Sequence, residues 1–142
     1  MYEDLTKEIL AYFFIKKPPV KPDVIAYGLG FNITFTKVPT PKISGIIYNK
    51  EIVINSSDPI VRQRFSLAHE LGHYFLHDQS SSFHKFDKEY IRKEQEADLF
   101  AASLLMPLFM LENYLYLPVE EIAKIFIVSR KAVELRLKVI TS

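Results

Sequence analysis

The spacing of apolar residues changes along the chain from helical to alternating and then back to helical. Near the N-terminus it predicts a short amphipathic helix over residues 2–14. The proline-rich segment 16–22 must end this helix, because proline removes a backbone donor and clashes with the preceding turn. A second short helix is predicted over residues 22–29, and glycine residues mark its end. The N-terminal part of the chain is therefore expected to be helical.

Alternating apolar and polar residues follow and predict β-strands. Residues 31–36 alternate, with phenylalanine and isoleucine on one face. Residues 44–48 and 51–55 flank Asn49-Lys50, which is typical of a hairpin with a two-residue turn. We expect these three strands to form a small antiparallel sheet.

Two long helices are predicted after the strands. The first covers residues 59–77, with Asp58 as a candidate N-cap followed by proline at the first helical position. Gly72 lies inside this helix, where glycine costs about 1 kcal/mol relative to alanine, so we expect another backbone to approach closely there. The second helix covers residues 88–106, with Asp87 as its candidate N-cap. A small sheet followed by helices predicts the α+β class.

The last third of the sequence is also predicted to be helical, beginning with a helix over about residues 107–116. Residues 119–142 resemble a helix–turn–helix pair in which Ser129 caps the second helix. The expected core of this pair is Ile122, Ala123, Phe126, Val128, Val133 and Leu137. Glu134 lies on the face that a DNA reader presents to the major groove, so we favour structural support or substrate docking over DNA binding. We treat the pair as part of one domain over residues 1–142.

The chemistry of the chain centres on the segment His69-Glu70-Leu71-Gly72-His73, an H-E-x-x-H pattern. Residues four apart share a face of a helix, so His69 and His73 can each direct an imidazole nitrogen at one Zn²⁺. Glu70 lies about 100° around the helix, where it can act as general base toward a water without replacing it. The pattern therefore predicts a zinc site. The alternative is a surface pair of imidazoles that binds no metal.

A catalytic zinc ion takes three protein ligands, so one more must come from another segment. The extended pattern with a third histidine is excluded, because it needs glycine and histidine where the chain has Leu76 and Gln79. The following predicted helix offers Glu94 and Asp98, which are four apart and share a face. We predict Glu94 as the third ligand and Asp98 as the acceptor that orients a ligating histidine. Glu96 is the competing ligand, but it points about 160° away if Glu94 faces the metal.

With these motifs in place, the sequence resembles the ImmA/IrrE family of zinc metallopeptidases. The resemblance rests on residues 64–73, which read R-F-S-L-A-H-E-L-G-H, and on the acidic segment 94–98. Residues 100–107, which read F-A-A-S-L-L-M-P, and residues 52–55 before the first long helix also look like that family. The resemblance covers about residues 30–140, and the combined motifs are specific.

The resemblance implies a gluzincin-like metallopeptidase fold. It implies His69, His73 and Glu94 as zinc ligands and Glu70 as the catalytic base. The family includes peptidases that relieve repression by cleaving helix–turn–helix repressors. A repressor of this kind is therefore the substrate that the resemblance implies.

Further histidines and tyrosines remain open as site residues. His77 follows His73 by four positions, and either extends the row of ligands or is a histidine favoured at a helix end. His84 lies in a predicted loop, and either reaches over the cleft or is solvated. The strand 44–48 is a candidate cleft rim that binds substrate by strand addition. The candidate donors to the oxyanion are Tyr48, Tyr74, His84 and Tyr90, and the sequence does not choose among them.

Composition narrows the function further. The 142 residues carry a net charge of +1, which gives no support for a strong nucleic-acid field. The chain has no cysteines, so disulfides and thiolate ligands are excluded and a reducing cytoplasm is expected. The apolar run 9–15 follows acidic residues and is too short to cross a membrane, so we expect neither a signal peptide nor a membrane span.

We therefore predict a cytoplasmic, zinc-dependent endopeptidase that acts on a protein substrate. Two alternatives remain open. One is a zinc-stabilised module that holds a repressor without cutting it, and the other is a DNA-binding regulator that uses the C-terminal helices. The first alternative needs the same ligands as the enzyme, but a pure binder needs no base, so the presence of Glu70 favours the enzyme.

Overall fold

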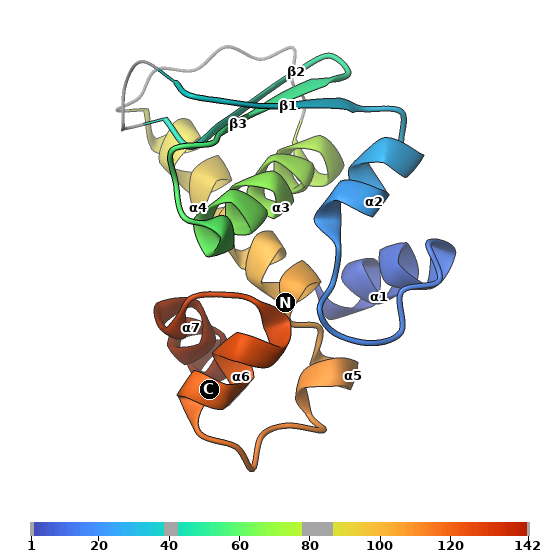
Figure 1. The fold of residues 1–142 in the computed structure, drawn as a ribbon, viewed down its shortest axis with the longest axis vertical. Coiled ribbons are helices and arrows are strands. Elements are labelled where there is room, and N and C mark those ends of the chain that lie inside the picture. Colours follow the sequence, from blue (N-terminus) through green and yellow to red (C-terminus); the bar gives the residue numbers. More distant parts are fainter. Residues whose placement is uncertain (1, 39–42, 78–86, 142) are drawn as a thin grey trace.

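The computed structural model describes residues 2–38, 43–77 and 87–141 and confirms the α+β class. Figure 1 shows a small sheet at one end of the molecule, the long helices beneath it, and the C-terminal helices at the opposite end. The elements within these ranges are α1 (Glu3–Tyr12), α2 (Pro22–Gly28), β1 (Asn32–Thr36), β2 (Gly45–Tyr48), β3 (Glu51–Asn55), α3 (Ile60–Leu76), α4 (Lys88–Leu105), α5 (Leu108–Leu111), α6 (Val119–Phe126) and α7 (Arg130–Thr141).

The sheet is mixed, which corrects the prediction of an antiparallel sheet. Strands β2 and β3 form the expected antiparallel hairpin, with Tyr48 opposite Glu51. Strand β1 lies on the other side of β3 and runs parallel to it, with Asn32 opposite Glu51, so the strand order is β1-β3-β2. Alternation of apolar residues reports which side chains face the core, and it is the same for a parallel and an antiparallel strand. The pattern therefore predicted the strands but not the direction of pairing.

Strand β3 is the centre of the sheet and joins it to the helices. Its Ile52 and Ile54 are fully buried, and they share one apolar core with Leu67 and Leu71 of α3. Helix α3 packs against β2, β3 and α4, and Figure 1 shows it beneath the sheet. This helix is therefore held from two sides by its apolar faces, which fixes the positions of the polar residues that it carries.

Gly72 marks the close approach of α3 and α4 that the sequence predicted. A Cβ added at this position would lie 3.1 Å from Cδ1 of Phe100, and 3.2 Å from both Cα and the carbonyl oxygen of Ala97. Two of these three atoms belong to the backbone of α4, so they cannot move without moving the helix. The glycine therefore sets the distance between the two helices.

Replacement of Gly72 by alanine should destabilise the protein, although alanine is the better helix former. Alanine gains about 1 kcal/mol of helix propensity, whereas overpacking against a fixed backbone costs about 1–3 kcal/mol. We expect the free energy of unfolding in urea to fall by up to about 2 kcal/mol. An unchanged or higher free energy would mean that α3 and α4 do not need this approach.

The two long helices begin differently from each other. Asp87 caps α4 as predicted, because its side chain accepts a hydrogen bond of 2.9 Å from the backbone N–H of Glu89. Asp58 does not cap α3. The N-cap of that helix is Pro59, without a side-chain hydrogen bond, and the backbone N–H of Asp58 instead donates to the carbonyl oxygen of Asn55 in the turn after β3.

Helix α5 is shorter than the predicted helix over residues 107–116.

The C-terminal helices form the predicted compact pair. Ile127 ends α6 in a left-handed conformation, and Oγ of Ser129 accepts a hydrogen bond of 3.0 Å from the backbone N–H of Ala132. The expected core residues are buried or partly buried: Ile122, Ala123, Phe126, Val128, Val133 and Leu137. Arg64 of α3 donates hydrogen bonds to the carbonyls of Phe126 and Ile127 at 3.2 and 3.0 Å. The pair is thereby attached to the helix that carries the H-E-x-x-H motif.

Among the described residues, the structure contains no helix that is both long enough and apolar enough to cross a lipid bilayer.

Candidate active site

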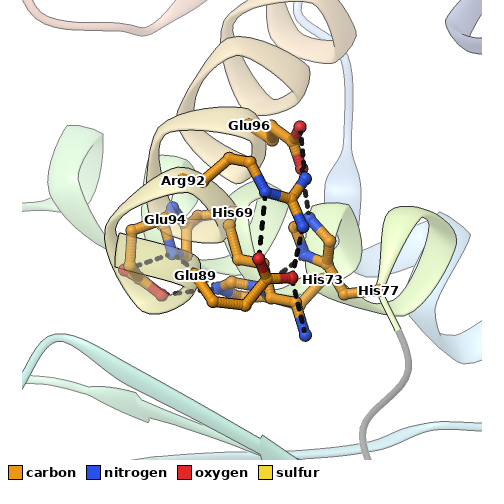
Figure 2. A network of polar contacts seen from close by, with 8 residues as sticks. His69, His73, His77, Glu89, Arg92, Glu94 and Glu96 are labelled. Carbon is orange, nitrogen blue, oxygen red and sulfur yellow. Dashed lines mark hydrogen bonds and ion pairs between the residues drawn. The ribbon is translucent and has the colours of Figure 1, made fainter. Parts of the chain in front are cut away.

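Helices α3 and α4 bring the three predicted ligands to one point (Figure 2). The Nε2 atoms of His69 and His73, from α3, lie 3.1 Å apart. Glu94, from α4, places one carboxylate oxygen 2.8 Å from Nε2 of His73 and the other 3.1 Å from Nε2 of His69. The spacing rules for single helices predicted this convergence, and Gly72 allows the two helices to come close enough to achieve it.

The donor set fits a zinc ion. Zinc ligands at about 2.0–2.1 Å in a tetrahedral arrangement have donor atoms roughly 3.3 Å apart. The three separations in the cluster, between 2.8 and 3.1 Å, are slightly shorter than this value. Two imidazoles and one carboxylate are also a usual ligand set for a catalytic zinc. A small outward adjustment of His69, His73 and Glu94 would therefore accommodate the ion.

Glu70 is the other acidic group beside the histidines. Ligand-type atoms of His69, Glu70 and His73 lie within 4.8 Å of one another, which makes Glu70 an alternative third donor. Glu94 is the better candidate, because both of its oxygens already contact the two histidine nitrogens. Glu70 is then left beside the cluster, in the position that the motif predicts for a base.

Asp98 contacts the outer nitrogen of His69, as predicted from its position one turn after Glu94. Its carboxylate lies 2.7 Å from Nδ1 of His69. Burial lowers the pKa of His69, but the hydrogen bonds to Asp98 and Glu94 outweigh burial and raise it to about 10. For Glu94, burial acts to raise the pKa. The hydrogen bonds from His69 and His73 outweigh burial and lower this pKa to about 2. The cluster therefore favours a positive charge at this point, either a proton or a metal cation.

The structure gives His77 and Glu96 positions that the sequence did not predict. Among the described histidines, Glu96 contacts His77 rather than His69 or His73. It lies 2.8 Å from Nε2 of His77, and Nδ1 of His77 lies 2.9 Å from Nδ1 of His73. The contact between His73 and His77 could have been predicted from their spacing of four residues, which places the two rings on one face of α3. His84 lies outside the described residues.

Glu70 is buried beside the cluster, with 6% of its surface exposed. Burial raises the pKa of this carboxyl, and the charges of His69 and His73 oppose that change. Gly45 of β2 lies against this side chain, since a Cβ there would be in van der Waals contact with Cγ of Glu70 at 3.4 Å. A carboxyl with a raised pKa at the wall of a cleft is the kind of group that can take up and return a proton.

The cluster opens into a cleft of about 630 Å³ between β2, α3, α4 and α7. Ser44 and Gly45 of the sheet edge line one side, next to Glu70. The cleft continues to the C-terminal helix, where its walls are mixed. Val61, Phe65, Leu99, Ala102, Ala132, Leu135 and Val139 supply apolar surface, and Arg62, Ser129, Lys131 and Arg136 supply polar surface. The cleft is therefore longer than the ligand cluster and can hold several residues of an extended chain.

Among the candidate donors to an oxyanion, Tyr90 lines the cleft together with Glu70 and Glu94. Burial raises the pKa of Tyr90, and the charges of Glu94 and Glu70 raise it further, so its hydroxyl keeps its proton. Tyr74 instead packs edge-on against Phe31, with ring centres 5.0 Å apart. Tyr48 does not line the cleft, and its side chain is largely exposed. The structure thus reduces the described candidates to Tyr90.

Comparisons with known proteins find a family, a relative and a solved structure that are similar to this chain. The sequence model of the peptidase M78 family, described as the IrrE N-terminal-like domain, matches residues 26–138. "Metallopeptidase ImmA" of Bacillus subtilis (strain 168) is 35% identical over 68 residues, which are 46% of this chain and 40% of that protein. A Mycobacterium tuberculosis transcriptional regulator has a similar fold, with a TM-score of 0.71 and 13% identity, over 92% of this chain and 44% of that chain.

This chain spans less than half the length of either protein. The likeness to the mycobacterial regulator, at 13% identity, concerns the fold alone. The family model, in contrast, matches most of the chain and includes both helices that carry the acidic and histidine cluster. The chain therefore belongs to the ImmA/IrrE family of metallopeptidases.

Proposed function

We propose that this chain is a zinc-dependent endopeptidase in which His69, His73 and Glu94 hold the metal and Glu70 is the general base. The observation that carries the proposal is the contact of both Glu94 oxygens with the two Nε2 atoms, at 2.8 and 3.1 Å, beside a buried Glu70. Membership of a metallopeptidase family supports it.

The chain's own residues divide the reaction among them. When bound, zinc supplies a Lewis acid that polarises the scissile carbonyl and makes water a better nucleophile. Glu70 accepts the proton of the attacking water at its carboxylate and returns it to the departing amine. Tyr90 donates a hydrogen bond to the carbonyl oxygen as negative charge develops on it. The burial of Glu70 supports its role, because a raised pKa matches a group that both takes and gives a proton.

Strand β2 supports the binding of an extended substrate. It is an edge of the described sheet, since β3 flanks it on one side only. Ser44 and Gly45 at its start line the cleft beside His69 and Glu70. An extended peptide can add to the edge of a sheet as a further strand. A substrate strand that paired with β2 in this way would pass directly over the proposed zinc site.

The arm of the cleft next to α7, which has apolar and basic side chains, gives the substrate a second place to bind. Leu135 and Val139 of α7 line this arm, together with Leu99 of α4. An apolar side chain of the substrate would be buried there, several residues away from the bond that is cut. Docking of this kind supports a selective endopeptidase rather than an enzyme that degrades any unfolded chain.

The geometry gives less support to DNA binding by the C-terminal helices. Arg130, the first residue of α7, forms ion pairs with Glu120 and Glu134. Leu135 of the same helix faces the cleft rather than an independent surface. A DNA reader needs cations available to phosphates, so these ion pairs would weaken binding.

The substrate we propose is a helix–turn–helix transcriptional repressor. The test is co-expression with any helix–turn–helix repressor that a neighbouring gene encodes, comparing wild type with Glu70→Gln. We expect a discrete cut in the repressor with wild type only, and slow action on casein. Rapid degradation of casein with an intact repressor would contradict this substrate while leaving the peptidase chemistry in place.

Replacement of Asp98 by alanine should weaken zinc binding or activity by about 10–100-fold, because Nδ1 of His69 would lose its carboxylate partner. The measurement is zinc affinity by competition with a chelator, together with the rate of substrate cleavage. Asp87→Ala is a suitable control, since that residue caps the same helix and lies outside the cleft lining. Wild-type affinity and rate in Asp98→Ala would mean that Asp98 does not support the ligand.

A further inference from the structure

The second ring nitrogen of His73 faces another histidine rather than a carboxylate. Nδ1 of His73 lies 2.9 Å from Nδ1 of His77, and Nε2 of His77 lies 2.8 Å from an oxygen of Glu96 (Figure 2). His69, in contrast, places its Nδ1 directly against Asp98 at 2.7 Å. The two proposed ligands of α3 are thus supported in two different ways.

The direction of the hydrogen bonds in this chain follows from the carboxylate at its end. An ionised carboxylate only accepts, so Nε2 of His77 carries a proton and donates it to Glu96. In a neutral His77, Nδ1 is then the acceptor. With a metal bound at Nε2 of His73, Nδ1 of His73 would carry the ring proton and donate it to Nδ1 of His77; without a metal, a proton on Nε2 faces Glu94 at 2.8 Å.

We infer that His77 and Glu96 are positioning residues that fix the tautomer and the ring orientation of His73 for metal binding. The inference rests on the proposed zinc site. It assigns to Glu96, through His77, the task that Asp98 performs for His69, because a ligating histidine needs an acceptor for its other N–H. Each ligand of α3 then has its own acceptor on α4.

The carboxylate at the end of this chain is itself held in place. Arg92 donates to both oxygens of Glu96, at 2.9 and 2.8 Å, and also contacts Glu89. The guanidinium keeps Glu96 ionised and aimed at His77, and therefore keeps it an acceptor. Only 6% of the His77 side chain is exposed, so water has little access to replace either partner.

The test compares two replacements of His77. His77→Phe keeps a ring of similar shape and removes the acceptor. His77→Asn places a carbonyl oxygen where Nδ1 was and keeps it. Glu96→Ala removes the acceptor at the partly exposed end of the chain and gives a second variant that is less disruptive to the fold. Glu89→Ala is the matched control, because Glu89 contacts the same arginine and none of the described histidines.

Two readouts are needed. The first is zinc affinity by chelator competition, and the second is the hydrogen-bonded Nδ1–H of His73 in zinc-loaded protein, followed by its ¹H and ¹⁵N shifts and its exchange with water. We expect His77→Phe to weaken zinc binding about 10–100-fold and to make the Nδ1–H of His73 exchange faster with water. We expect Glu96→Ala to shift both readouts in the same direction, and His77→Asn and Glu89→Ala to stay close to wild type.

The outcomes separate this inference from the proposed function. Wild-type zinc affinity and an unchanged Nδ1–H of His73 in both His77→Phe and Glu96→Ala would overturn the positioning role, even if the wild type binds zinc and cuts its substrate. A wild type that binds no zinc would overturn the proposed function and this inference with it.

Discussion

The variant Glu70→Gln should bind zinc like wild type and lose peptide cleavage by at least about 10²–10⁴-fold, the usual contribution of a general base. Glutamine has the same shape as glutamate, so the packing of this buried side chain against Gly45 should be preserved. Its amide cannot accept and return a proton. Zinc should remain, because His69, His73 and Glu94 form the proposed ligand set without it.

The measurement is the rate at which purified protein cleaves the substrate, with zinc content determined on the same sample. Glu112→Gln makes the same chemical change at an exposed residue that does not line the cleft, and should leave the rate unchanged. If Glu70→Gln cuts at the wild-type rate, Glu70 is not the base. If it loses zinc together with activity, Glu70 is a ligand instead.

The second large effect is expected at Glu94. Replacement by alanine removes both oxygens that contact His69 and His73. Zinc affinity should fall by more than about 100-fold, since the loss of a ligand exceeds the loss of a group that only orients one. The residual two-histidine site should not retain the metal during dialysis against a chelator.

Glu89→Ala is the matched control for this prediction, because it removes a carboxylate from the same helix outside the ligand cluster. Metal analysis after dialysis should find one zinc per chain in wild type and in Glu89→Ala, and little in Glu94→Ala. If Glu94→Ala retains zinc and Glu70→Gln loses it, then Glu70 is the ligand and Glu94 is not.

The part of the site that the sequence predicted depends on spacing within single helices. His69 and His73 are four apart, and so are Glu94 and Asp98, so each pair shares a face whatever the rest of the fold does. Gly72 added the information that the two helices approach closely. The contacts between Glu94 and both histidines follow from these three facts together.

The parts that the sequence did not predict depend on how elements meet. The direction of β1 relative to β3 goes with the strand order β1-β3-β2, and the alternation of apolar residues does not report it. Glu96 was expected to point away from the metal, yet the position of His77 at the end of α3 gives it a partner. Pairing across two helices of this kind is visible only once their relative position is known.

The most direct test of the central claim is the intact mass of the repressor substrate after incubation with this protein. Zinc-free wild type should leave the substrate whole, and addition of one equivalent of zinc should give two fragments whose masses sum to that of the substrate plus one water. Fragments formed at the same rate in excess chelator would contradict a zinc-dependent peptidase. An intact substrate in the presence of fully zinc-loaded wild type would contradict hydrolysis and favour a module that binds without cutting.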